Sequence, residues 1–149
     1  MALFGAAYFD RKFWAILVPI LGYWLSSLIF DNVIYAQYYD SFQWFSQPLV
    51  YVAFGLTAVL GFGLFRNVSV GRVAGGAVGA TLIFFVLANT SAWLAMPQLY
   101  PPTAAGWSMA LVAGLPFLPM TLLGNLVYCA VLFGGYAYLR SVRPAWVRA

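Results

Sequence analysis

Histidine and glutamate are absent from this chain, and few other ionisable side chains are present. Lysine and arginine together number 7, aspartate supplies all 3 acidic residues, and charged residues make up only 7% of the sequence. A soluble domain needs a charged shell, and charged residues account for about 25% of a typical soluble sequence. The scarcity of charge therefore excludes a soluble enzyme, a soluble nucleic-acid-binding protein and a disordered chain.

The missing histidines also remove the side chains on which much catalysis and metal binding depend. General acid–base catalysis near neutral pH usually relies on imidazole, and a Ser-His-Asp triad and histidine-ligated zinc or haem require it. The single cysteine, Cys129, can form neither an internal disulfide nor a thiolate cluster. We therefore expect no catalytic residue, no metal site and no cofactor, and a protein that is not an enzyme.

Apolar side chains, by contrast, are abundant: 64% of the residues are hydrophobic and 19% are aromatic. A helix needs about 17–25 mostly apolar residues to span the hydrocarbon layer of a membrane. Charged and loop-forming residues divide the sequence into four segments of about this length, at 13–30, 48–65, 73–96 and 121–139. A fifth segment, 104–118, is short for a full crossing, and the apolar residues 2–9 are too few to span.

These segments predict an all-α integral membrane protein, a single polytopic bundle of four to five transmembrane helices in one domain over 1–149. If 104–118 does not cross, all 7 cations lie on one side of the membrane, as the positive-inside rule prefers. If it crosses, the cations are divided between the two sides. Charge counting thus favours a short, re-entrant 104–118, with Pro116 and Pro119 at its turn. The basic tail 140–149 then serves as a cytoplasmic anchor or as a specific lipid or partner site.

Polar side chains within the apolar segments are few, and several share a helical face with aromatic residues. Asn89 and Trp93 lie four residues apart, and Asn125 precedes Tyr128 by one turn. Buried amides in membranes usually hold helices together, at about 0.6 kcal/mol each. They can also line a small polar and aromatic pocket. For this second role the candidate ligand-binding residues are Asn89, Trp93, Tyr100, Trp107, Asn125 and Tyr128.

Glycines in the segment GRVAGGAVG form a stripe on one helical face. Gly71, Gly75 and Gly79 recur every four residues, a spacing that lets another backbone approach closely. The partner backbone could belong to this chain or to another subunit.

Lysine, arginine and aspartate are all missing from the four clear apolar segments, which argues against a proton-driven pump or antiporter.

A set of short motifs runs through the second half of the chain. They are Phe84-Phe85 before Asn89, then Trp93, Tyr100-Pro101 with Thr103 and Gly106, Leu115-Pro116-Phe117, Thr121-Leu122, Gly124 and Leu132-Phe133-Gly134. Together with the opening ALFGAAYF, they resemble an uncharacterised family of bacterial membrane proteins that carries a domain of unknown function. That family looks related to the substrate-binding S components of energy-coupling-factor vitamin importers.

The resemblance covers most of residues 2–139 and implies a six-helix, S-component-like bundle in complete relatives, with 104–118 and 121–139 as separate helices. Relatives usually carry one more helix before the ALFG stretch, which implies that this chain lacks the first helix or starts downstream of it. At two positions where relatives commonly have an acidic residue, this chain has Ser27 and Asn125.

Two functions fit these observations. The first is a non-enzymatic, S-component-like subunit of the bacterial inner membrane that binds a small solute for uptake. Because the chain has no G-x-x-x-x-G-K-[ST] motif, a separate ATPase module would supply the energy. The second is a structural accessory subunit of a larger respiratory or photosynthetic complex, packed through its glycine stripe and aromatic surfaces. The expected partners are membrane lipids and other transmembrane subunits, and not nucleic acid.

Overall fold

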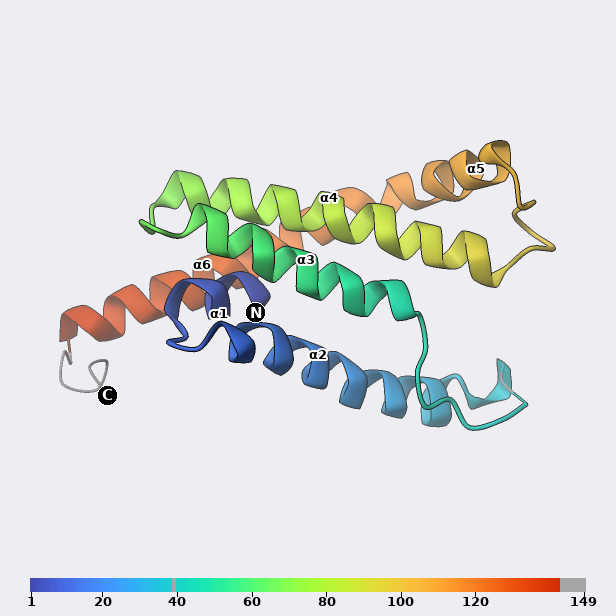
Figure 1. Ribbon diagram of the computed structural model, residues 1–149, viewed down its shortest axis with the longest axis horizontal. Helices are drawn as coiled ribbons and strands as arrows, with labels where there is room; N and C mark the ends of the chain where they lie inside the picture. Colours follow the sequence, from blue (N-terminus) through green and yellow to red (C-terminus); the bar gives the residue numbers. More distant parts are fainter. Residues whose placement is uncertain (39, 143–149) are drawn as a thin grey trace.

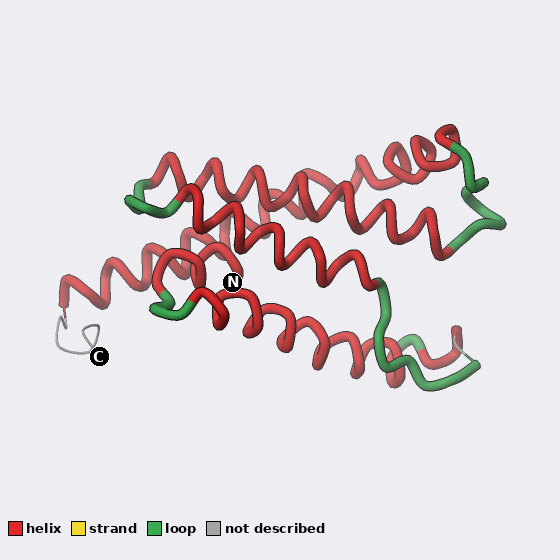
Figure 2. The backbone as a smooth tube through the Cα atoms, in the orientation of Figure 1, coloured by secondary structure: helices red, strands yellow, loops and turns green. Residues whose placement is uncertain are grey.

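The computed structural model describes residues 1–38 and 40–142, and this part of the chain contains helices and loops but no strand (Figures 1 and 2). The α-helices are α1 (Ala2–Tyr8), α2 (Lys12–Ile29), α3 (Pro48–Leu64), α4 (Val70–Ala95), α5 (Ala104–Gly114) and α6 (Leu118–Val142). A π-helical turn, Phe30–Ile34, extends α2. Of the predicted basic tail, Arg143, Trp146 and Arg148 lie outside the described residues.

Three helical segments are long and apolar enough to cross a membrane, namely Lys12–Ile34, Val70–Ala95 and Ala104–Val142. The helix α3 is also apolar but has only 17 residues. The four segments that the sequence predicts as spans are all helical, and their bounds differ from the expected ones by a few residues. The all-helical class is therefore confirmed, and the long apolar helices indicate a membrane protein.

The short apolar start of the chain forms a helix inside the bundle. Leu3 of α1 is only 5% exposed, and α1 packs against α3, α2 and α6. Small residues allow this approach: a Cβ on Gly5 would lie 3.0 Å from the Ala15 Cα atom, and one on Gly61 would lie 2.6 Å from the Ala6 Cβ atom. The residues of α1 are too few to span a membrane, and they instead fill the interior of the helical bundle.

The helix α4 is central, because α3, α5 and α6 all pack against it, while α2 packs against α1 and α3 (Figure 1). Its buried positions include Gly76, Ala77 and Ala80, whose small side chains let the neighbouring helices come close. The three glycines of the predicted stripe do not share the same surroundings in the structure. A Cβ on Gly79 would come within 2.8 Å of the Leu60 side chain, whereas one on Gly71 or Gly75 would meet open space.

The helices α5 and α6 are joined by a single 3₁₀ turn, Leu115–Phe117. The chain bends at this turn without reversing, so both helices run back along α4 (Figure 1), within one 39-residue apolar segment. The predicted re-entrant turn at Pro116 and Pro119 is therefore not observed. Proline is tolerated in the first turn of a helix, where its missing N–H would have no partner anyway, and both prolines occupy such positions.

The alternating helix directions give the bundle two different ends (Figure 1). At one end lie the α1–α2 corner, the α3–α4 connection and the last turn of α6. We call it the cationic end, since it holds every lysine and arginine of the described residues: Arg11, Lys12, Arg66, Arg72 and Arg140. The opposite, acidic end consists of the 30–47 and 96–103 connections, which carry Asp31 and Asp40 and no cation. Charge counting predicted this segregation for a chain in which 104–118 makes no crossing of its own.

Candidate ligand-binding cavity

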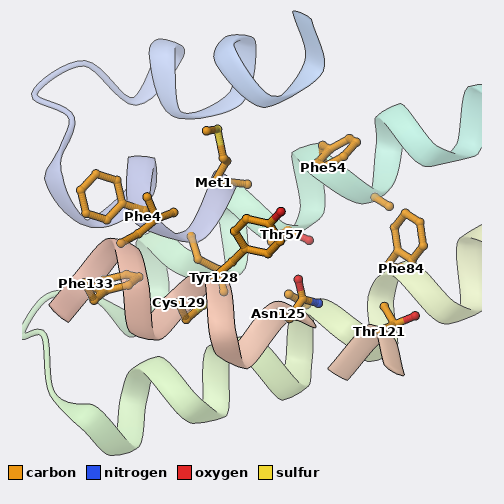
Figure 3. A pocket seen from close by; sticks show the side chains of 15 residues that line it. Met1, Phe4, Phe54, Thr57, Phe84, Thr121, Asn125, Tyr128, Cys129 and Phe133 are labelled. Carbon is orange, nitrogen blue, oxygen red and sulfur yellow. The ribbon is translucent and has the colours of Figure 1, made fainter. Parts of the chain in front are cut away.

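A groove lies on the surface of α4, between α3 and α6. Both helices pack against α4 without packing extensively against each other, and α1 closes the groove towards the cationic end. The groove contains a cavity of about 230 Å³ (Figure 3). Its walls are mainly apolar and aromatic, with rings from Phe4, Phe54, Phe84 and Phe133. The polar residues in the lining are Thr57, Thr121, Asn125 and Tyr128.

The amide of Asn125 is held in a defined orientation. Its Nδ2 donates a hydrogen bond of 2.8 Å to Thr81 Oγ1, and Thr81 in turn donates one of 2.8 Å to the Ala77 carbonyl oxygen of α4. No hydrogen bond from the described residues reaches Asn125 Oδ1. Figure 3 shows this oxygen on the side of Tyr128 and Thr57. The amide therefore ties α6 to α4 with its nitrogen and presents a free acceptor to the cavity.

Two hydroxyl groups near this acceptor have no hydrogen-bonding partner among the described residues, those of Thr57 on α3 and Tyr128 on α6. Thr121 differs, because its hydroxyl donates a hydrogen bond of 3.0 Å to the Phe117 carbonyl oxygen. A polar group in apolar surroundings is costly without a partner. The cavity thus combines one free acceptor and two hydroxyls with aromatic walls, and the Met1 α-amino group lies at its edge, which suits a small and partly polar ligand.

A second, smaller hollow of about 190 Å³ lies beside the α5–α6 joint and shares Phe84 and Thr121 with the first. Asn89 lines this hollow, and its Nδ2 donates a hydrogen bond of 2.7 Å to the Phe85 carbonyl oxygen. A Cβ on Gly114 would collide with the Asn89 amide, so glycine is required for α5 to approach α4 here.

The other predicted site residues lie at the acidic end, where they brace the connection between α4 and α5. Trp93 Nε1 donates a hydrogen bond of 2.8 Å to the Pro101 carbonyl oxygen, and Trp107 Nε1 donates one of 2.9 Å to Thr90 Oγ1. The Tyr100 backbone N–H bonds to the Met96 carbonyl oxygen at 2.9 Å.

The structure therefore divides the six predicted residues into three groups. Asn125 and Tyr128 share the main cavity, Asn89 lines the neighbouring hollow, and Trp93, Tyr100 and Trp107 line neither space. Helical spacing identifies residues on one face of one helix. It does not show which faces of different helices meet.

Of the residues that line the cavity, only Asn125 and Tyr128 were predicted from the sequence as site residues. Thr57 interrupts an otherwise apolar stretch of α3, and this exception was a usable signal. The opening residues Ala2, Leu3 and Phe4 also line the cavity. From the sequence, this opening segment was predicted only to be apolar and too short to span a membrane. Within the described ranges, no cluster of three or more His, Cys, Asp or Glu residues could hold a metal ion.

Comparisons with known proteins place the chain in a family without linking it to a function. No curated protein and no solved structure matches it. The model of a family of unknown function, DUF6580, matches residues 1–146. This match carries no link to importer S components, so that part of the resemblance remains an expectation. Since the match covers nearly the whole sequence, the chain belongs to the family of unknown function DUF6580.

Proposed function

We propose that this protein is a non-enzymatic, multi-pass membrane protein that binds a small solute in the cavity between α3, α4, α6 and α1, as an S-component-like uptake subunit. The observation that carries the proposal is the Asn125 amide. Its nitrogen is fixed by Thr81 at 2.8 Å while its oxygen remains free in a space walled by aromatic rings. An amide that served only to hold helices together would not need a cavity beside it.

The size of the cavity supports a small ligand. Sites for drug-sized molecules usually measure about 300–1,000 Å³ and are mostly apolar with a few placed polar groups. A volume of about 230 Å³ falls below that range and would admit a single ring or a short chain. No lysine, arginine or aspartate side chain lines the cavity, and the one ionisable amine in the lining is the Met1 α-amino group, whose pKa is lowered by burial.

Uptake would require a partner. The chain has no phosphate-binding motif, and the charged residues of its long helices, Lys12, Arg72 and Arg140, lie near helix ends and cannot relay protons across a membrane. A separate ATPase module and a coupling transmembrane subunit would therefore supply the energy. By the positive-inside rule the cationic end would face the cytoplasm, in agreement with a location in the bacterial inner membrane.

Purification in mild detergent from the native membrane, followed by mass spectrometry, tests this proposal. We expect a small molecule to copurify with the wild-type protein and to be lost from Asn125→Leu, which removes the amide but keeps a similar volume. Asn67→Leu, in the exposed loop between α3 and α4, is the matched control and should retain the molecule. Co-migration with an ATPase pair would support the uptake role. An empty wild-type protein would contradict solute binding.

Accessory-subunit function is the second candidate, and it is supported by two open glycines spaced four residues apart on α4. Gly71 and Gly75 of α4 face open space, with no atom of the described chain within contact of an added Cβ. A transmembrane helix from another subunit could approach closely at this point. Under this alternative, Gly75→Leu should remove the protein from a respiratory or photosynthetic complex on a native gel. Gly22→Leu, at an equally open position on α2, should leave it assembled.

A further inference from the structure

We infer that the ligand of this cavity enters sideways from the hydrocarbon layer, through a mouth between α3 and α6, and that it is a lipid-soluble ring compound with both a hydrogen-bond donor and an acceptor. The inference rests on the proposed function and names the chemical class of its ligand. It depends on three features of the cavity: where it is open, how deep it lies along the helices, and which polar groups it offers.

The opening is on the side of the bundle. Two lining residues are largely exposed, Met1 at 74% and Tyr128 at 68%, whereas the inner wall is buried, with Ala80 at 6% and Cys129 at 9%. Figure 3 shows the Met1 and Tyr128 side chains next to each other at one edge of the cavity. Since α3 and α6 do not pack extensively against each other, this edge is the mouth.

The route from the cationic end is blocked by packed side chains. Leu3 of α1 is 5% exposed and belongs to the same buried cluster as Phe65 and Phe133. The Phe4 ring adds an edge-on contact to Phe133, with centroids 5.4 Å apart. A solute dissolved in the water at this end would have to displace the core to reach the cavity.

The polar groups of the cavity lie close to the middle of their helices. Thr57 is near the centre of the 17-residue α3, and Asn125 is near the centre of the 39-residue segment Ala104–Val142. At about 1.5 Å of rise per residue, each lies at least ~10 Å from either end of its helix. The hydrocarbon core is about 30 Å thick, so a lateral mouth at this depth faces acyl chains and not water or headgroups.

The chemistry of the lining then selects the ligand. Asn125 Oδ1 can only accept a hydrogen bond, while the Thr57 and Tyr128 hydroxyls can donate one. Hydrocarbon offers no water to satisfy these groups, so a ligand that donates to Asn125 and accepts from a hydroxyl gains most. The flanking rings of Phe54 and Phe84 favour a flat aromatic or quinonoid group through edge and offset-stacked contacts.

Fluorine NMR on the full chain in phospholipid nanodiscs tests the inference with three probes. 4-Fluorophenol is lipid-soluble and has a donor and an acceptor, fluorobenzene has no hydroxyl, and 4-fluorobenzoate is charged and water-soluble. We expect saturable binding of 4-fluorophenol above its partition into empty nanodiscs, at least tenfold weaker binding of fluorobenzene, and no saturable binding of 4-fluorobenzoate.

Variants identify the cavity as the binding site. Thr57→Val keeps the side-chain shape and Tyr128→Phe keeps the ring, and each should weaken 4-fluorophenol binding several-fold. Tyr138→Phe is the matched control, because Tyr138 lies on the same helix with a similar exposure of 67%, outside the cavity, and should bind normally. Equal binding by all three variants would overturn the assignment of these hydroxyls.

Paramagnetic broadening tests the route of entry. A lipid with a nitroxide at the end of its acyl chain should broaden the bound 4-fluorophenol signal more than a water-soluble gadolinium chelate does. The reverse order, or saturable binding of 4-fluorobenzoate that Asn125→Leu abolishes, would overturn entry from the bilayer but leave solute binding intact. Failure of all three probes to bind saturably would contradict this inference. The proposed function would be contradicted only if, in addition, no solute copurified with the wild-type protein.

Discussion

The two ends of the bundle are held together by different forces. At the cationic end, aromatic rings of α1 pack against α6: Tyr8 lies 4.0 Å from Tyr136 and 5.6 Å from Phe133 between ring centroids. Phe65, at the end of α3, lies 5.4 Å from the Phe133 ring. Burial and the neighbouring Tyr136 phenol raise the pKa of Tyr8, while the nearby Arg140 opposes them. This end is a packed aromatic core.

At the acidic end, hydrogen bonds from side chains to backbone hold the long connections. Asn32 Nδ2 donates to the carbonyl oxygens of Leu28 at 3.0 Å and Gln43 at 2.9 Å, and its Oδ1 accepts from the Gln43 backbone N–H at 2.7 Å. Trp24 Nε1 donates to the Trp44 carbonyl oxygen at 3.0 Å. Here polar side-chain atoms, the Asn32 amide and the indole N–H groups, make the connections.

The comparison shows which property of a residue matters at each end. In the aromatic core, stability depends on the volume and burial of the rings, because the stabilisation comes from the apolar area removed from solvent. At the acidic end, stability depends on single polar atoms, because each hydrogen bond holds one loop segment in place. Substitutions that remove volume should therefore act globally at the cationic end, and substitutions that remove polar atoms should act locally at the acidic end.

The largest effect is expected for Phe133→Ala. Phe133 is 7% exposed and contacts the rings of Phe4, Tyr8 and Phe65. Removing a buried phenylalanine ring typically costs about 3–5 kcal/mol. Thermal unfolding in detergent should show a much lower midpoint. Phe42→Ala, at a 56% exposed ring of the acidic end, is the control and should change the midpoint little. Equal losses at both ends would contradict the comparison.

A smaller and local effect is expected for Asn32→Leu. The substitution removes the two hydrogen bonds that join Asn32 to Gln43 in the 40–47 segment, together with the bond to the Leu28 carbonyl oxygen, and leaves the Gln43 backbone without its partners. Leaving a partly buried polar group unpaired costs about 1–3 kcal/mol. Hydrogen exchange measured by mass spectrometry should accelerate in 40–47 and remain unchanged in α1 and α4. Faster exchange throughout the bundle would show that the loop is not an independent unit.

A still smaller effect is expected for Trp107→Phe, which keeps an aromatic ring but removes the indole N–H that bonds to Thr90 Oγ1 at 2.9 Å. One hydrogen bond contributes about 0.5–1.5 kcal/mol, so the unfolding midpoint should fall slightly. Trp14→Phe is the matched control, since the exposed indole of Trp14 makes no hydrogen bond within the described residues and its loss should change nothing measurable. If both variants unfold alike, the bond contributes nothing.

The smallest effect is expected for Gly75→Ala. An added Cβ meets open space there, and alanine is favoured over glycine in a helix by at most about 1 kcal/mol, so unfolding should shift slightly upwards. Gly76→Ala, one residue on, would bring a Cβ within 3.1 Å of the buried Phe65 ring and should be neutral or destabilising. A loss of stability in Gly75→Ala would show that this face of α4 is packed against other atoms.

Much of the fold could be predicted from the sequence, because the length of an apolar stretch between charges directly limits where a spanning helix begins and ends. The candidate site could be predicted only in part. Asn125 and Tyr128 lie one turn apart on the same helix, so their proximity follows from helical geometry alone. The separation of Trp93 and Trp107 from the cavity depends on how α4 and α5 pack, and no spacing in the sequence contains that information.

By itself, the sequence determined the all-helical class and the membrane character, since the length of an apolar stretch acts locally along the chain. The tertiary structure decided three further points. It placed α1 inside the bundle, joined α5 to α6 in a bent helix, and set Thr57 opposite Asn125 across a cavity. Each of these depends on contacts between helices distant in sequence, where the shapes of small and aromatic side chains determine which faces meet.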